Sequence, residues 1–175
     1  VRDRAQISSS TEGNGNAGNI SIRADDEVSL VNSIIISEVT EGLGNGNGGN
    51  IFIDANILEL VNGSSLLADT ETIGDAGSIV INANERVLLS GQGPGATDPT
   101  QTVPSQITTT VEDQAVGNGG NIDIFGGILA ITDSAFIRTS TFGQGPAGDV
   151  SIQVDSLTAT DGSQIAAFTT SSKPA

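Results

Sequence analysis

Short runs of alternating apolar and polar residues follow one another along this chain, and each run is bounded by Gly, Asn or Asp. A period of two residues is typical of β-strands with one buried face, whereas the 3.6-residue period of an amphipathic helix is absent. The high glycine content argues further against helices, because glycine is a poor helix former. The pattern therefore predicts an all-β protein.

The alternating runs belong to an internal repeat. The segment Gly-Asn-Ala-Gly-Asn-Ile-Ser-Ile at 15–22 recurs with small changes at 46–53, 74–81, 117–124 and 145–152. Successive copies begin 31, 28, 43 and 28 residues apart. The basic unit is therefore 28 residues long, and the longer intervals contain insertions.

Each unit contains three short alternating segments. In the first segment the apolar positions start at Ile20, Ile22 and Ala24, and in the second they start at Val28 and Leu30. Apolar residues recur at the equivalent positions of the later copies, and we expect them to form inward columns. The third segment opens at an aliphatic residue, and a threonine usually follows four residues later. The opening positions are Ile7, Ile36, Leu66, Ile107, Ile137 and Ile165, and the threonines are Thr11, Thr40, Thr70, Thr141 and Thr169.

Three strands in each near-identical unit predict a solenoid, in which equivalent strands stack in parallel and equivalent side chains form columns. We expect a right-handed parallel β-helix of about five coils, about 24 Å tall at about 4.8 Å per coil. The whole chain, 1–175, forms one segment whose coils begin near residues 19, 50, 78, 121 and 149, with an insertion loop at 92–104. A β-sandwich is the alternative fold, but it would not require the same columns in the same order.

Composition excludes several classes of function. The chain has 21 acidic and 6 basic residues, a formal charge of -15, and neither His nor Cys. A Ser-His-Asp triad, a thiol nucleophile, an imidazole or thiolate metal site and a disulfide are therefore excluded. We expect no nucleic-acid partner, because no basic patch exists to neutralise phosphates, and no membrane insertion, because no apolar run approaches about 18 residues. No residue is assigned a catalytic, cofactor-binding or metal-binding role.

The Gly-Asn corners are interpreted as structural. Asn19, Asn50 and Asn121 recur at one position, and asparagine tolerates left-handed turns and can hydrogen-bond along a stack. A phosphate-binding loop is disfavoured because no Gly-Lys-Ser/Thr sequence follows the glycines. A calcium-binding nonapeptide repeat is disfavoured because the period is 28 and Asn stands where that motif needs Asp.

Three departures from the repeat are candidates for function. Three prolines in 92–104 predict an extended loop that is incompatible with strands. Such insertions often carry recognition, but a tolerated loop without function is the favoured interpretation. An acidic run comprises Asp25, Asp26 and Glu27, with Glu38 and Glu41 following. A column of like charge is expected at Glu12, Glu41, Glu71 and Glu112. The column is interpreted as a solvated corner, with a weak calcium ladder as the alternative, because calcium prefers oxygen ligands.

Two segments carry a resemblance to a known family. Ser-Thr-Phe-Gly-Gln-Gly-Pro-Ala-Gly-Asp-Val-Ser-Ile at 140–152 and Thr-Glu-Gly-Asn-Gly-Asn-Ala-Gly-Asn-Ile-Ser-Ile at 11–22 resemble the repeats of filamentous-haemagglutinin-like exoproteins of the cyanobacterial type. The resemblance covers the chain except 92–104. It implies a right-handed β-helical shaft, export by two-partner secretion through an outer-membrane partner, and an adhesive role. Because the chain opens in the third strand of a coil, we expect an internal slice of a longer exoprotein.

The function expected from these observations is a structural and adhesive shaft segment of a large secreted exoprotein, extracellular or on the outer cell surface, without catalysis and without a cofactor. Its partners would be glycans or proteins of host or neighbouring cell surfaces. Two alternatives remain open. One is a carbohydrate-binding or polysaccharide-cleaving β-helix, for which only five Phe and neither Trp nor Tyr could form a sugar platform, with Phe52 and Phe125 facing outward. The other is end-to-end stacking into an extracellular fibre.

Overall fold

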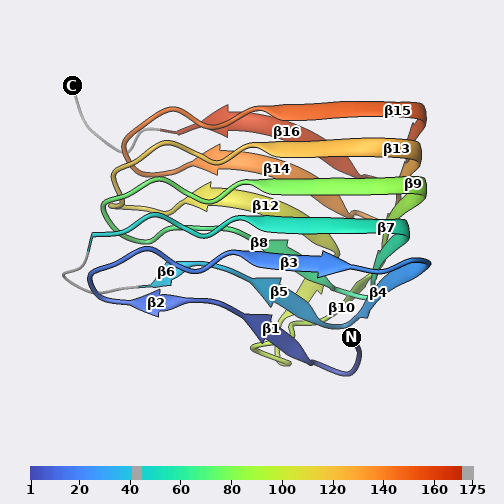
Figure 1. Ribbon diagram of the computed structural model, residues 1–175, viewed down its shortest axis with the longest axis horizontal. Helices are drawn as coiled ribbons and strands as arrows, with labels where there is room; N and C mark the ends of the chain where they lie inside the picture. The colour runs from blue at the N-terminus through green and yellow to red at the C-terminus, as the bar shows by residue number, and fades with distance from the viewer. Residues whose placement is uncertain (41–44, 171–175) are drawn as a thin grey trace.

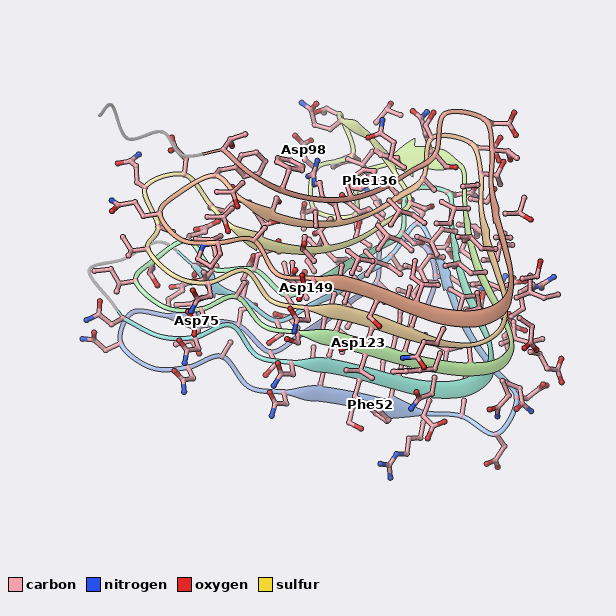
Figure 2. The ribbon with its side chains drawn as sticks, turned by 90° about the horizontal axis from the view of Figure 1, so that it is seen from above. Phe52, Asp75, Asp98, Asp123, Phe136 and Asp149 are labelled. Carbon is pink, nitrogen blue, oxygen red and sulfur yellow. The ribbon has the colours of Figure 1, made fainter. Side chains whose placement is uncertain are left out.

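Parallel strands stack coil upon coil in the computed structural model, which describes residues 1–40 and 45–170 (Figure 1). The chain climbs from the N-terminal coil to the C-terminal coil in Figure 1. Seen from above in Figure 2, it runs counter-clockwise as it rises, so the winding is right-handed. The described residues contain no helix, and the predicted parallel β-helix of about five coils is confirmed.

One face of the solenoid is sheet A, in the order β15-β13-β9-β7-β3, with β4 also beside β7. The two segments predicted at the start of each coil are separate strands only in the first coil. In the next four coils they join into one strand of 10 to 12 residues, and the register shifts at Ala55/Ile57 and at Gly126/Ile128. The strands are β3 (Ile20–Arg23), β4 (Glu27–Val31), β7 (Ile51–Val61), β9 (Ile79–Ser90), β13 (Ile122–Ile131) and β15 (Val150–Ala159).

The opposite face is sheet B, in the order β1-β5-β8-β12-β14-β16. All neighbours are parallel, and a short parallel pair, β2 with β6, continues the first two coils. The strands are β1 (Gln6–Ser8), β2 (Thr11–Glu12), β5 (Ile34–Ile36), β6 (Val39–Thr40), β8 (Ser65–Leu67), β12 (Gln106–Val111), β14 (Phe136–Thr141) and β16 (Gln164–Thr169).

The phase predicted for sheet B is wrong by one residue in a single coil. Ile35, not Ile36, pairs with Ile7 and with Leu66. The same shift places Val39, not Thr40, beside Thr11. The physical reason is local: residues 34, 35 and 36 are all isoleucine, so alternation cannot tell which one points inward.

The core lies between the two sheets and is built from the predicted columns. Ile51 pairs with Ile79 and Ile53 with Ile81, and all four side chains are fully buried. Hydroxyl groups line the interior beside the glycine corners. Thr109 Oγ1 donates to the carbonyl of Gly120 at 2.6 Å, and Thr139 Oγ1 donates to that of Gly148 at 2.6 Å. These bonds satisfy main-chain acceptors inside an otherwise apolar core.

The Gly-Asn corners form ladders between coils. Asn50 N donates to Asn19 Oδ1 at 2.8 Å, and Ser78 N donates to Asn50 Oδ1 at 2.8 Å. Asn121 N then donates to Ser78 Oγ at 3.1 Å, and Asp149 N donates to Asn121 Oδ1 at 2.9 Å. The predicted hydrogen bonding of this column along the stack is confirmed. The short polar side chain of one coil satisfies the backbone of the next.

The insertion predicted as a loop incompatible with strands is a β-hairpin. Strands β10 (Gln92–Pro94) and β11 (Thr102–Pro104) pair antiparallel, and Gly95 N donates to Gln101 O at 2.8 Å. The prediction was wrong because proline is excluded from central strands but tolerated in an isolated two-stranded ribbon, where every strand is an edge. At the exposed tip, Asp98 Oδ1 accepts hydrogen bonds from Thr100 N and Thr100 Oγ1 at 3.0 and 2.6 Å.

Candidate functional site

Side chains with binding chemistry gather on the outer face of sheet B, near its C-terminal coils. Phe136 and Arg138 occupy alternate positions of β14, Phe142 follows that strand, and Phe168 lies on β16. Between them, Ile137, Thr139 and Thr141 point inward and are fully buried. We call the outward set Phe136, Arg138, Phe142 and Phe168 the aromatic patch. Figure 2 shows Phe136 on the opposite side of the solenoid from Phe52.

The aromatic patch is organised around one guanidinium group. Arg138 Cζ lies 4.8 Å from the ring centre of Phe136, 5.7 Å from that of Phe168 and 6.0 Å from that of Phe142. Phe142 and Phe168 meet edge to face, with ring centres 5.7 Å apart and planes at 75°. Each cation–π contact stabilises the arrangement by about 0.5–1 kcal/mol at a site open to water. All four side chains are half-buried, so the cluster still presents surface to solvent.

Four carboxylates lie on the same face, in the middle coils. Glu38 stands beside Asp69 in the register set by the Val39 and Thr70 bridge, and Glu71 stands beside Glu112 in the register set by Thr70 and Val111. We call Glu38, Asp69, Glu71 and Glu112 the acidic cluster. Asp69 is the buried member, with 8% of its surface exposed, and its Oδ1 accepts a hydrogen bond from Thr110 N at 2.7 Å.

Burial and mutual repulsion raise the pKa of three of these carboxyl groups. Desolvation holds the pKa of Asp69 well above its ordinary value, and the charges of Glu112 and Glu38 add to this against the lowering effect of the Thr110 hydrogen bonds. Desolvation, followed by Glu71 and Glu112, raises the pKa of Glu38. Desolvation and then Glu71 raise the pKa of Glu112, while Arg138 opposes the rise. These three carboxyl groups therefore hold their protons more tightly than isolated carboxyl groups do.

The predicted column of like charge is not continuous. Glu12 pairs with Thr40, so the second coil places a threonine in the column, and Glu41 lies outside the described residues. Among the residues that the structure describes, only Glu71 and Glu112 are stacked neighbours in that column. No group of three or more acidic side chains in 1–40 and 45–170 is arranged to hold a metal ion, so the calcium ladder receives no geometric support.

The predicted acidic run of Asp25, Asp26 and Glu27 lies on a different face from Glu38, which was grouped with it, and Glu41 is outside the described residues. Asp25 and Asp26 are exposed at the bend between β3 and β4 on sheet A, whereas Glu38 lies on sheet B. Asp25 lines an open groove of about 520 Å³ on sheet A, together with Arg23, Ala24, Asp54, Ala55, Asn56 and Asn84. Arg23 Cζ lies 5.7 Å from the ring centre of Phe52, and within 1–40 and 45–170 this is the one cation–aromatic pair on sheet A.

The sequence pointed to Glu38, Glu71 and Glu112 as candidates, but Asp69 and the grouping of the aromatic patch were missed. Asp69 was hidden by the one-residue error at Ile36, which places Glu38 and Asp69 in different columns. The aromatic patch had a signal, because Phe136, Arg138 and Phe142 are separated by even numbers of residues and so share one face of a strand. The same spacing could not show that Phe168 joins the patch, because the register between coils decides which residues lie next to it.

The fold and this face together define a right-handed β-solenoid with a polar and aromatic outer surface. Comparisons with protein-family models, with curated proteins and with solved structures give no match for this chain. No helix in the part of the chain that the structure describes is long and apolar enough to cross a membrane.

Proposed function

We propose that this chain is a structural and adhesive shaft segment of a large secreted exoprotein and that it performs no catalysis. The observation that carries the proposal is the regular stack of coils. Strands β7, β9, β13 and β15 pair in parallel along almost their whole length, with the same inward columns in each. A stack of this kind spans distance and repeats its outer surface, which are the properties that a shaft needs.

The resemblance of 11–22 and 140–152 to filamentous-haemagglutinin-like repeats supports the same proposal. In that setting the protein is exported through an outer-membrane partner and acts outside the cell or on its surface. Its partners are glycans or proteins of other cell surfaces. The formal charge of -15 keeps such a surface soluble and disfavours contact with polyanions.

An antibody raised against this chain tests the proposal on intact cells of the source organism. We expect labelling of the cell surface or the surrounding matrix, and reduced attachment of cells in the presence of the antibody. Pre-immune serum and permeabilised cells are the controls. Label confined to the interior of permeabilised cells would overturn the proposal, and release of reducing sugar from polysaccharides by the purified chain would overturn its non-catalytic part.

A further inference from the structure

The aromatic patch combines three chemical properties in one place. Its ring surface is apolar and half-exposed, and its guanidinium supplies several hydrogen-bond donors. Glu112 stands beside Phe142 in the register set by the Val111 and Thr141 pair, and its carboxylate supplies acceptor oxygens. Among the residues that the structure describes, Arg138 has no carboxylate oxygen within 4.0 Å and so forms no ion pair. Its Nε is buried without a hydrogen-bond partner there, so packing against the rings holds the group more than polar contacts do.

We propose that the aromatic patch is a carbohydrate-binding site for a neutral polysaccharide. The C–H faces of sugar rings pack against aromatic side chains, as other apolar surfaces do, and Phe142 and Phe168 offer adjacent rings from successive coils. Sugar hydroxyl groups both donate and accept hydrogen bonds. The guanidinium of Arg138 donates to them and the carboxylate of Glu112 accepts from them.

The neighbouring polar residues extend this surface along the solenoid axis. Gln106 of β12 and Gln164 of β16 flank Phe136 on the two adjacent coils, and Gln106 is half-buried while Gln164 is exposed. Since adjacent strands are about 4.8 Å apart, an extended polymer lying across β12, β14 and β16 meets a new set of side chains at every coil. A polymer therefore fits this face better than a single sugar.

Charge decides between neutral and anionic polymers. The chain carries a formal charge of -15, and the acidic cluster lies on the same face as the aromatic patch. An anionic polymer would be repelled by these carboxylates along most of its length, and a single Arg138 does not compensate for them. A neutral polymer meets no such penalty.

The hairpin of β10 and β11 does not block this surface. Figure 2 places Asp98, at the hairpin tip, on the same side of the solenoid as Phe136. Figure 1 shows the hairpin at the level of the N-terminal coils, whereas β14 and β16 lie near the opposite end. The patch is therefore open from the side.

This inference deepens the proposed adhesive function by naming a ligand class, and its test is separate. Purified protein is run in native gels that contain soluble galactomannan, mixed-linkage β-glucan or dextran as neutral probes, or polygalacturonate as the anionic probe. We expect at least one neutral polysaccharide to retard the protein and polygalacturonate to leave it unretarded. If no neutral probe retards the protein, or if polygalacturonate alone does, the inference is overturned. The proposal that the protein acts at the cell surface is not affected by that result.

Substitutions test whether the polysaccharide binds at the aromatic patch. Phe142→Ala combined with Phe168→Ala is expected to weaken binding at least about tenfold, as loss of a central aromatic anchor does. Phe142→Leu keeps apolar volume but removes the flat ring, so it should also weaken binding while the fold persists. Phe52→Ala, which removes the ring paired with Arg23 on sheet A, is the matched control and should leave binding unchanged.

Folding of each variant is checked by far-ultraviolet circular dichroism and by its thermal midpoint. If Phe142→Leu folds like the parent and binds with unchanged affinity, the patch is not the site. If Phe52→Ala weakens binding as much as the double variant does, the binding face is sheet A and the inference is also overturned.

Discussion

Single glycines decide how closely the coils of this solenoid approach one another. A Cβ atom at Gly77 would lie 2.1 Å from the carbonyl oxygen of Gly49, and one at Gly120 would lie 1.9 Å from that of Gly77. These obstructing atoms are backbone, so they cannot rotate away as a side chain can. At Gly49, Gly77, Gly120 and Gly148 the glycine is therefore required by contact between coils and not by a left-handed backbone conformation.

Gly77→Ala is expected to destabilise the protein by about 1–3 kcal/mol or more, as an overpacked site does. Urea unfolding followed by circular dichroism measures the loss. The matched control is Gly18→Ala at the same repeat position, where a Cβ would meet only the side chain of Ser9, closest at its Oγ. Because that hydroxyl can rotate, the control should lose much less stability. Equal losses in the two variants would show that the close approach of the coils is not the cause.

At the scale of elements, sheet B is less regular than sheet A because polar side chains enter its ladder. Strand β8 ends at Leu67, and two residues later the carboxylate of Asp69, rather than a main-chain carbonyl, accepts the bond from Thr110 N. Burial of Asp69, which raises its pKa, lowers stability at neutral pH, because folding either buries its charge or makes it take up a proton that the unfolded chain has released. The free energy of unfolding therefore falls as the pH rises above about 3.9, the usual pKa of an unfolded aspartate.

Asp69→Asn is expected to raise the thermal midpoint at pH 7, because the amide oxygen can still accept from Thr110 N and no charge is buried. Near pH 4 the parent carboxyl is protonated, so the advantage of the variant should shrink. Midpoints measured at both pH values test this. Asp123→Asn, the same charge change on the outer face of sheet A, controls for the general effect of reducing the net charge. A variant less stable than the parent at both pH values would contradict the expectation.

At the scale of the whole molecule, each coil contacts only its neighbours, so stability is a sum of coil-to-coil interfaces. Strands β7, β9 and β13 have a partner on both sides within sheet A, whereas β15 and β3 have one. The apolar residues of β7 and β9 that face inward are fully buried, while those of β15 are only partly covered.

Native-state hydrogen exchange should therefore be slowest in β7, β9 and β13 and faster in β3, β15 and β16. Protection follows the free energy of local opening, which is lowest where fewest interfaces must break. Mass spectrometry of peptic peptides resolves the coils. Uniform protection across all strands would show that the chain opens only as one cooperative unit.

Most of sheet A followed from the sequence alone. Five near-identical copies set the phase of every inward position from Ile20 to Ala159, and the pairing observed between strands reproduces those columns. The third segment was less secure. Its copies are joined by insertions and, at 34–36, by an unbroken apolar run, so neither the repeat nor the alternation marks one inward residue.

The sequence by itself determined that the chain is a β-solenoid, because a repeat that alternates every two residues can bury its apolar face only by stacking on its own copies. Only the tertiary structure decided which outward side chains meet. Phe142 and Phe168 lie 26 residues apart in the chain, and their rings touch because β14 and β16 stack in register. Glu38 and Asp69 meet for the same reason. Contacts across coils depend on axial register, and one residue of slip replaces every neighbour.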